Sequence, residues 1–215
     1  MYLLTGIVLA IDCSYGDFTL LQEKAENNSA FKFLYKELTL EYGKEMCYEI
    51  IEVQRNLKSL FPDLEKLTIS LDTDHNSSCP TSDMTDCPKN LKTVELNNLK
   101  DKTLPKICQH QITDLDCHSC DNLKDISSVS DMENLETLKI YDANLMKLEG
   151  NLFEKNKNLE KLELRKCNIK KVYKNSLNGL LNLEVIVLDG NLNMDIPSGN
   201  IGSLQTIEHV KCPIS

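Results

Sequence analysis

The chain has 215 residues, a formal net charge of −9, 41% hydrophobic residues and no tryptophan. Its negative charge disfavours binding to nucleic acids and to anionic lipid surfaces, because both attract positive potential. No apolar stretch reaches the ~20 residues that a membrane-spanning helix needs, so we expect no membrane insertion by this chain.

Residues 1–16 have the pattern of a secretory signal peptide. An apolar stretch over residues 3–11 is followed by small residues that place a cleavage site before Asp17. No Lys or Arg lies near Met1, which departs from the usual signal. We assign residues 17–60 to an N-terminal capping region with a first degenerate repeat, and residues 61–215 to regular repeats.

Leucines in the second half recur with the spacing Leu-x-x-Leu-x-Leu-x-x-(Asn/Cys/Ala)-x-(Leu/Ile). The clearest copies begin at Leu135, Leu159 and Leu183, so the period is 24 residues. A unit of one short strand and one return segment cannot bury its apolar side alone, so neighbouring copies must stack. The spacing predicts an α/β leucine-rich repeat solenoid: a curved horseshoe with a parallel β-sheet on its concave face and irregular or short helical return segments on its convex face. Weaker copies, which bring the expected total to about eight turns, begin at Tyr35, Leu64, Leu91, Ile112 and Leu204.

Each repeat is expected to point positions one, four and six inward. The ninth position usually carries an asparagine whose amide satisfies backbone groups of adjacent turns. Here it is Ala143, Cys167 and Asn191 in turn. Phe153 and Leu177 both fall on the nineteenth position, where an apolar residue is expected to pack under the convex side.

The cysteines favour an oxidising compartment. There are nine, and removal of Cys13 with the signal leaves an even number. Cys79 and Cys87 lie in a polar insertion over residues 72–90, and a disulfide between them is the pairing we predict. Pairing of Cys47 with Cys108 remains an alternative. Four others fall on inward repeat positions, where buried thiols are expected: Cys117, Cys120, Cys167 and Cys212.

Two N-glycosylation sequons agree with secretion. They are centred on Asn27 and Asn76, and the second lies in the polar insertion, where a surface glycan is tolerated.

Two other patterns have a weaker functional interpretation. Cys108, His110, Cys117, His118 and Cys120 could supply zinc ligands, but the repeat turns His118 away from the two neighbouring cysteines, so we expect no metal site. A basic run over residues 165–174 is expected to be a solvated surface rather than a functional patch.

Catalytic motifs are missing from the sequence. It contains no Gly-x-Ser-x-Gly, phosphate-binding glycine loop or His-Glu-x-x-His. His209 takes an inward sixth position, where a core role is favoured over catalysis. We therefore expect neither an enzyme nor a cofactor.

Strand positions between the inward leucines are the candidates for binding, because a parallel solenoid presents them on one extended concave surface. One aromatic among them could act as an anchor. The predicted partner-binding residues are Glu95, Asn97, Asp116, His118, Lys139, Tyr141, Glu163, Arg165, Val187 and Glu208.

The stretch from Asn134 to Asn191 contains Asn-Leu-Glu-Thr-Leu-Lys-Ile and Asn-Leu-Glu-Lys-Leu-Glu-Leu. It resembles extracellular leucine-rich repeat proteins, most of all the ectodomains of invertebrate Toll-type receptors and their secreted relatives. The resemblance implies recognition of a protein ligand or receptor in innate immunity or development. The cysteine-rich cap usual in that family after the last repeat is not found before Ser215, so we expect a truncated product, a fragment, or an edge covered by a partner.

Two functions from different classes follow. The first is a secreted, extracellular recognition module that binds a protein through the concave sheet. The alternative is an intracellular, cytoplasmic leucine-rich repeat scaffold or inhibitor whose thiols stay reduced.

Overall fold

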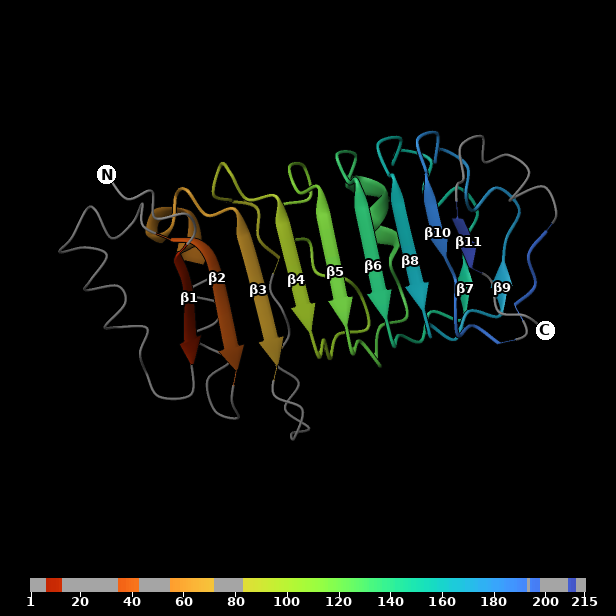
Figure 1. Cartoon of the computed structure of the whole chain (residues 1–215), viewed down its shortest axis with the longest axis horizontal. Coiled ribbons are helices and arrows are strands. Elements are labelled where there is room, and N and C mark those ends of the chain that lie inside the picture. The colour runs from red at the N-terminus through yellow and green to blue at the C-terminus, as the bar shows by residue number, and fades with distance from the viewer. Residues whose placement is uncertain are drawn as a thin grey trace.

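The computed structural model describes residues 7–12, 35–42, 55–71, 83–192, 194–197 and 209–211, and within them the side chains of all but 7–12, 42 and 209–211. These residues form a solenoid with a nine-stranded sheet in the order β1-β2-β3-β4-β5-β6-β8-β10-β11, in which every neighbouring pair is parallel (Figure 1). The strands are β1 (Ile7–Asp12), β2 (Tyr35–Tyr42), β3 (Lys66–Leu71), β4 (Thr93–Asn97), β5 (Asp114–His118), β6 (Thr137–Tyr141), β8 (Lys161–Arg165), β10 (Val185–Val187) and β11 (His209–Lys211).

Short elements lie in the segments that connect these strands. Residues 55–60 form a helical turn, and Ser127–Asp131 forms the 3₁₀ helix η3. A second parallel sheet pairs β7 (Lys147–Leu148) with β9 (Lys171–Val172). Among the described residues, no helix has the length and apolar character to cross a bilayer.

The core consists of the inward rows that the spacing predicts. Leu138 and Leu162 are adjacent in the sheet register and both are fully buried, as are Ile140 and Leu164 in the next inward row. Phe153 is also fully buried, and Leu177 is nearly so, which confirms the expected apolar position in the return segments. Because each turn covers the apolar rows of its neighbours, stacking supplies the burial that one turn lacks.

A left-handed residue follows the strand in successive turns. Positive φ angles occur at Asn98, Ser119, Asp142 and Lys166, directly after β4, β5, β6 and β8. Gly190 takes the same conformation, and a Cβ there would lie 2.7 Å from Cγ of Lys166. This turn redirects the chain, so that the ninth repeat position points back into the core.

Asn191 occupies that ninth position and is fully buried. Its Oδ1 accepts hydrogen bonds from the backbone N–H groups of Cys167 and Ile169, and its Nδ2 donates to the carbonyls of Leu164 and Leu188. One side chain thus satisfies buried backbone groups of two adjacent turns, as predicted. In the preceding turn, Cys167 makes a weaker link of the same kind, because its Sγ donates to the carbonyl of Ile140 at 3.3 Å.

The predicted disulfide between Cys79 and Cys87 is wrong, because Cys87 is bonded to Cys108. Met84 forms a parallel bridge with Ile107, and the N–H of Cys108 donates to the carbonyl of Met84. These contacts bring Cys87 beside the next turn of the solenoid. Because Cys108 is bonded to Cys87, the alternative pairing of Cys47 with Cys108 is also excluded. Cys47 and Cys79 lie outside the described residues.

Cys117 and Cys120 are fully buried as expected, but they are not thiols. They form a disulfide with a Cα–Cα distance of 6.4 Å across the left-handed residue Ser119. Cys167 is a free, buried thiol, as predicted, and burial raises its pKa to about 12. Cys212 lies outside the described residues.

The strand β1 falls within the segment predicted to be a signal peptide. It pairs in parallel with β2 over Ile7–Asp12. Cleavage before Asp17 would remove β1 and leave β2 as the edge of the sheet. The signal peptide stays a prediction. A cleaved chain would begin its sheet with β2, and an uncleaved chain would begin it with β1.

Candidate functional site

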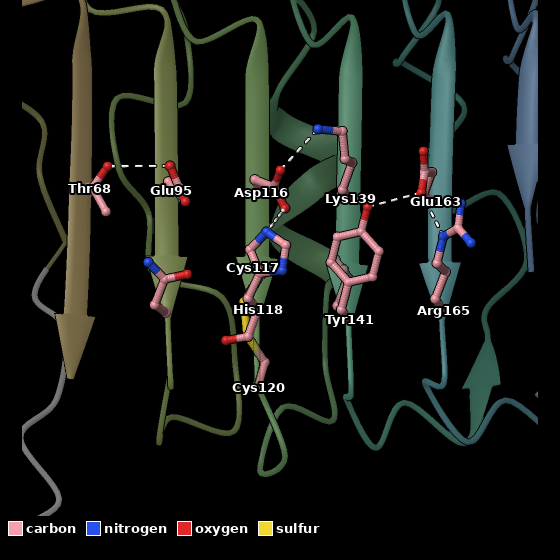
Figure 2. A network of polar contacts seen from close by, with 12 residues as sticks. Thr68, Glu95, Asp116, Cys117, His118, Cys120, Lys139, Tyr141, Glu163 and Arg165 are labelled. Atoms are coloured by element: carbon pink, nitrogen blue, oxygen red, sulfur yellow. Dashed lines mark hydrogen bonds and ion pairs between the residues drawn. A yellow bond between two sulfur atoms is a disulfide. The ribbon is translucent and has the colours of Figure 1, made fainter. Parts of the chain in front are cut away.

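The outward side chains of the strands form three columns across the exposed face of the sheet. We call the surface formed by the outward residues of β2 to β8 the sheet face. The register aligns Glu95, Asp116, Lys139 and Glu163 in its central column, and Figure 2 shows them pointing to the same side. The inward residues between them are buried leucines, isoleucines, one valine and one half-cystine, so a packed core supports the sheet face.

Asp116 lies at the centre of one cluster on the sheet face. Its Oδ2 is 3.0 Å from Nζ of Lys139, and its Oδ1 is 2.8 Å from Nε2 of His118 (Figure 2). Oδ1 is buried and accepts no hydrogen bond of regular geometry, so its contact with His118 is an ion pair when the imidazole is protonated. The ion pair between Asp116 and Lys139 therefore links β5 to β6.

His118 and Tyr141 form an aromatic stack beside this cluster. Their ring centroids are 4.6 Å apart, and the rings are inclined by only 9°. His118 lies between the half-cystines of the Cys117–Cys120 disulfide, which restrains its backbone. The side chain of His118 is 43% exposed, so the stack presents apolar ring edges within a charged surface.

Glu163 is the centre of a second cluster. Its carboxylate accepts hydrogen bonds from the Tyr141 hydroxyl at 2.9 Å and from Nε of Arg165 at 2.7 Å, and Nζ of Lys161 lies 2.8 Å away. Burial opposes ionisation of Glu163, but the hydrogen bonds from Lys161, Arg165 and Tyr141 outweigh it and lower its pKa to about 2. Burial and the bond to Glu163 raise the pKa of Tyr141. These shifts keep Glu163 charged and Tyr141 protonated.

A third cluster surrounds Glu95 on β4. Nζ of Lys66 lies 2.8 Å from its carboxylate, and Thr68 donates a longer bond of 3.4 Å. Burial raises the pKa of Glu95, but the bond from Lys66 reverses that effect and lowers it; the same bond raises the pKa of Lys66. Next to this cluster, Asn97 donates to Ser70 across the strands at 3.0 Å.

The three clusters hold charged and polar side chains in fixed positions on the sheet face. Cys108, Cys117 and Cys120 are bonded in disulfides, so the zinc ligands considered from the sequence are not thiolates. Within the described residues, no group of three or more metal-ligating side chains converges. What the arrangement can do chemically is present a prepositioned pattern of charge and aromatic edge to another molecule.

The structure brings together most of the residues that the sequence selected for binding. One of them, Val187, is a wrong prediction, because its side chain is only 4% exposed and cannot serve as an exposed contact. Glu163 is also buried, at 5% exposure, beneath its own partners, so Lys161 and Arg165 provide the accessible surface there. The binding candidate Glu208 and the predicted glycosylation sites Asn27 and Asn76 lie outside the described residues.

Lys66 and Lys161 are functional candidates that sequence reasoning missed. Each lies two residues before the central-column residue of its own strand, so its side chain is on the same side of the sheet. For Lys161 the signal was present, because a lysine two residues before a carboxylate on a strand lies on the same side of the sheet as that carboxylate. It was not distinguishable from an ordinary solvated lysine without the packing around Glu163.

Comparison with known proteins gives no family assignment: no protein-family model matches the chain, and no curated protein matches it. The sheet face therefore has to be interpreted from its own geometry.

Proposed function

We propose that this chain is a leucine-rich repeat recognition module, related to Toll-type ectodomains and their secreted relatives, which binds a protein partner through the sheet face. The leucine-rich assignment is supported by the 24-residue period, the parallel sheet and the buried Asn191 at the ninth position. The proposed setting is innate immune or developmental signalling outside the cell.

The observation that carries the proposal is the His118–Tyr141 stack between the Asp116 and Glu163 clusters. Aromatic side chains surrounded by fixed charges are typical centres of protein interfaces, because they bury large area at low entropic cost. Ion pairs to Lys139, Lys161 and Arg165 hold the surrounding groups before a partner arrives, which reduces the ordering cost of binding.

The test is capture of secreted proteins of the source organism on the immobilised full chain. We expect at least one protein to be retained by the wild type and to fall about tenfold on a His118→Ala/Tyr141→Ala variant, since loss of an interface centre costs that much or more. Circular dichroism of the variant controls for folding.

A matched control exists on the other side of the molecule. Tyr173 is 37% exposed after β9, and Nζ of Lys171 lies 4.6 Å from its ring centre. A Lys171→Ala/Tyr173→Ala variant likewise truncates two side chains in contact, a tyrosine ring and a lysine, and it should capture as the wild type does. Equal capture by all three proteins would contradict the role of the sheet face.

Secretion is tested separately, by intact mass and non-reducing peptide mapping of the full-length product from eukaryotic cells. Disulfides such as Cys87–Cys108 and Cys117–Cys120 are typical of oxidising compartments. We expect a mature start near Asp17, a glycan on Asn76 and both disulfide-linked peptides. Retention in the cell with Met1 intact and nine free thiols would instead support the intracellular scaffold or inhibitor.

A further inference from the structure

Both half-cystines of the Cys87–Cys108 disulfide line a cavity of about 230 Å³. The cavity lies beside the segments that connect the strands, because Cys87 comes between β3 and β4 and Cys108 comes between β4 and β5. Other residues that line it include Asp83, Met84, Lys106 and His110. A small molecule that enters this cavity therefore contacts a disulfide bond in its wall.

The two disulfides of the described residues differ in how far solvent reaches them. Cys87 is only partly buried, whereas Cys108 is 4% exposed and both Cys117 and Cys120 are fully buried. In thiol–disulfide exchange a thiolate must approach one sulfur directly, so access decides which disulfide reacts and which of its sulfurs is attacked. Cys87 is the favoured point of attack, and the Cys117–Cys120 disulfide is an internal reference.

Opening the Cys87–Cys108 disulfide should leave the surrounding backbone in place. The N–H of Met84 donates to the carbonyl of Lys106, and the N–H of Cys108 donates to the carbonyl of Met84, each at 2.9 Å. The N–H of Lys106 also donates to the carboxylate of Asp83 at 2.8 Å. These three bonds join the same two segments as the disulfide does, so exchange at Cys87 is a local event rather than an unfolding step.

Two basic side chains line the cavity close to Cys108. Lys106 precedes it by two residues and His110 follows it by two, and within the described part of the chain neither forms an ion pair. Asp83, the acidic residue in the wall, already accepts the bond from Lys106. An ammonium and an imidazole favour a ligand with a carboxylate, and positive charge near a sulfur also favours its thiolate as a leaving group.

The volume of the cavity limits the size of the ligand. At ~30 Å³ for each molecule of liquid water, the cavity corresponds to roughly eight waters. Pockets for drug-sized ligands run from roughly 300 to 1,000 Å³, so this cavity suits a molecule of the size of a single amino acid.

We propose that the Cys87–Cys108 disulfide is an exchange site for small thiols that carry a carboxylate, such as free cysteine. The thiolate of the incoming molecule attacks Sγ of Cys87, a bond forms between these two sulfurs, and the Cys87–Cys108 bond breaks. Its electron pair passes to Sγ of Cys108, which takes a proton from water. The incoming sulfur is oxidised, the sulfur of Cys108 is reduced, and Cys87 carries a mixed disulfide. The residues named in the cavity wall do not belong to the sheet face, so this inference does not depend on the proposed function.

Peptide mapping of the disulfide-bonded, full-length protein tests the exchange. The protein is incubated with excess free cysteine near neutral pH, samples are quenched with acid and alkylated, and each cysteine is followed by mass spectrometry. We expect Cys87–Cys108 to open at least about tenfold faster than Cys117–Cys120, with the cysteine adduct on Cys87 and a free thiol at Cys108. The circular dichroism spectrum should not change during this reaction.

Cysteamine is the matched probe, because it is cysteine without the carboxylate. After correction for the rate of each thiol with a small disulfide in solution, cysteine should open Cys87–Cys108 at least about threefold faster than cysteamine. Lys106→Gln should abolish this preference. Lys102→Gln is the control variant, because it removes the same charge from an exposed position that does not line the cavity, and it should keep the preference.

Four results would overturn the inference. Two concern the position of exchange: equal rates of opening for the two disulfides, or an adduct on Cys108 in place of Cys87. The other two concern recognition of the carboxylate: a wild-type protein that reacts equally with cysteine and cysteamine, or a preference for cysteine that survives in Lys106→Gln. Capture of secreted proteins by His118 and Tyr141 is measured independently, so this inference and the proposed function fail separately.

Discussion

Replacing Asn191 with alanine is expected to lower the free energy of unfolding by about 3 to 5 kcal/mol, measured by urea denaturation. The asparagine makes four hydrogen bonds of 2.7 to 3.0 Å to backbone groups of two adjacent turns. The residue is fully buried, so water cannot replace these bonds, and each orphaned group costs about 1 to 3 kcal/mol before the structure relaxes.

Asn182→Ala is the matched control for that measurement. Asn182 is exposed and donates one hydrogen bond, at 3.0 Å, to the carbonyl of Lys157. Water can take its place, so we expect a loss of less than about 1 kcal/mol. If the two alanine variants unfold at the same urea concentration, the buried bonds of Asn191 do not stabilise the stack of turns.

Removing the charge of Glu163 should have the second largest effect. We expect Glu163→Gln to destabilise the protein by about 2 to 3 kcal/mol at pH 7, because Lys161 and Arg165 lose their anionic partner. The pKa of Glu163 is about 2 in the folded chain, against an ordinary value of 4.5. A lowered folded pKa contributes stability above the ordinary value, and that contribution disappears as the pH falls from about 5 toward 2.

The measurement is urea denaturation of wild type and variant across that pH range. The gap in unfolding free energy should be largest at pH 7 and should shrink as the acid protonates Glu163 in the wild type. Glu160→Gln, at an exposed position three residues earlier, should leave the stability unchanged at every pH. A gap between wild type and Glu163→Gln that is constant from pH 7 to 2 would argue against a charge effect.

These two positions stabilise different regions of the same architecture. Asn191 links the backbones of successive turns inside the solenoid, whereas Glu163 links β6 to β8 on the exposed side through Tyr141 and its cationic neighbours. In a solenoid each turn contacts only its neighbours, so such links between turns determine how cooperatively it unfolds. The sheet face is consequently rigid where we propose that it binds.

Much of the fold was predictable from local spacing. The inward rows of β6, β8 and β10 follow directly from leucines at repeat positions one, four and six, because side chains on a strand alternate between its two faces. The outward His118 was predictable for the same reason, and the buried Cys167 was predictable from its ninth position in the repeat. Position within one repeat was enough for each of these assignments.

Pairing between turns was not predictable in the same way. Cys79 was favoured as the partner of Cys87 because it lies close in sequence, but backbone contacts of Met84 with the next turn place Cys87 against Cys108. Likewise, Val187 belongs to an outward column by its position on the strand and is nevertheless buried. The strand pattern tells which side a residue faces but not what covers it.

The sequence by itself determined the period, the inward and outward positions and the aliphatic core of this protein, since each depends on residues within one repeat of 24. Only the tertiary structure decided the partner of Cys87, the hydrogen bond from Tyr141 to Glu163 and the stacking of His118 on Tyr141. The physical reason is that these contacts join different turns, and their geometry depends on the register in which the turns stack.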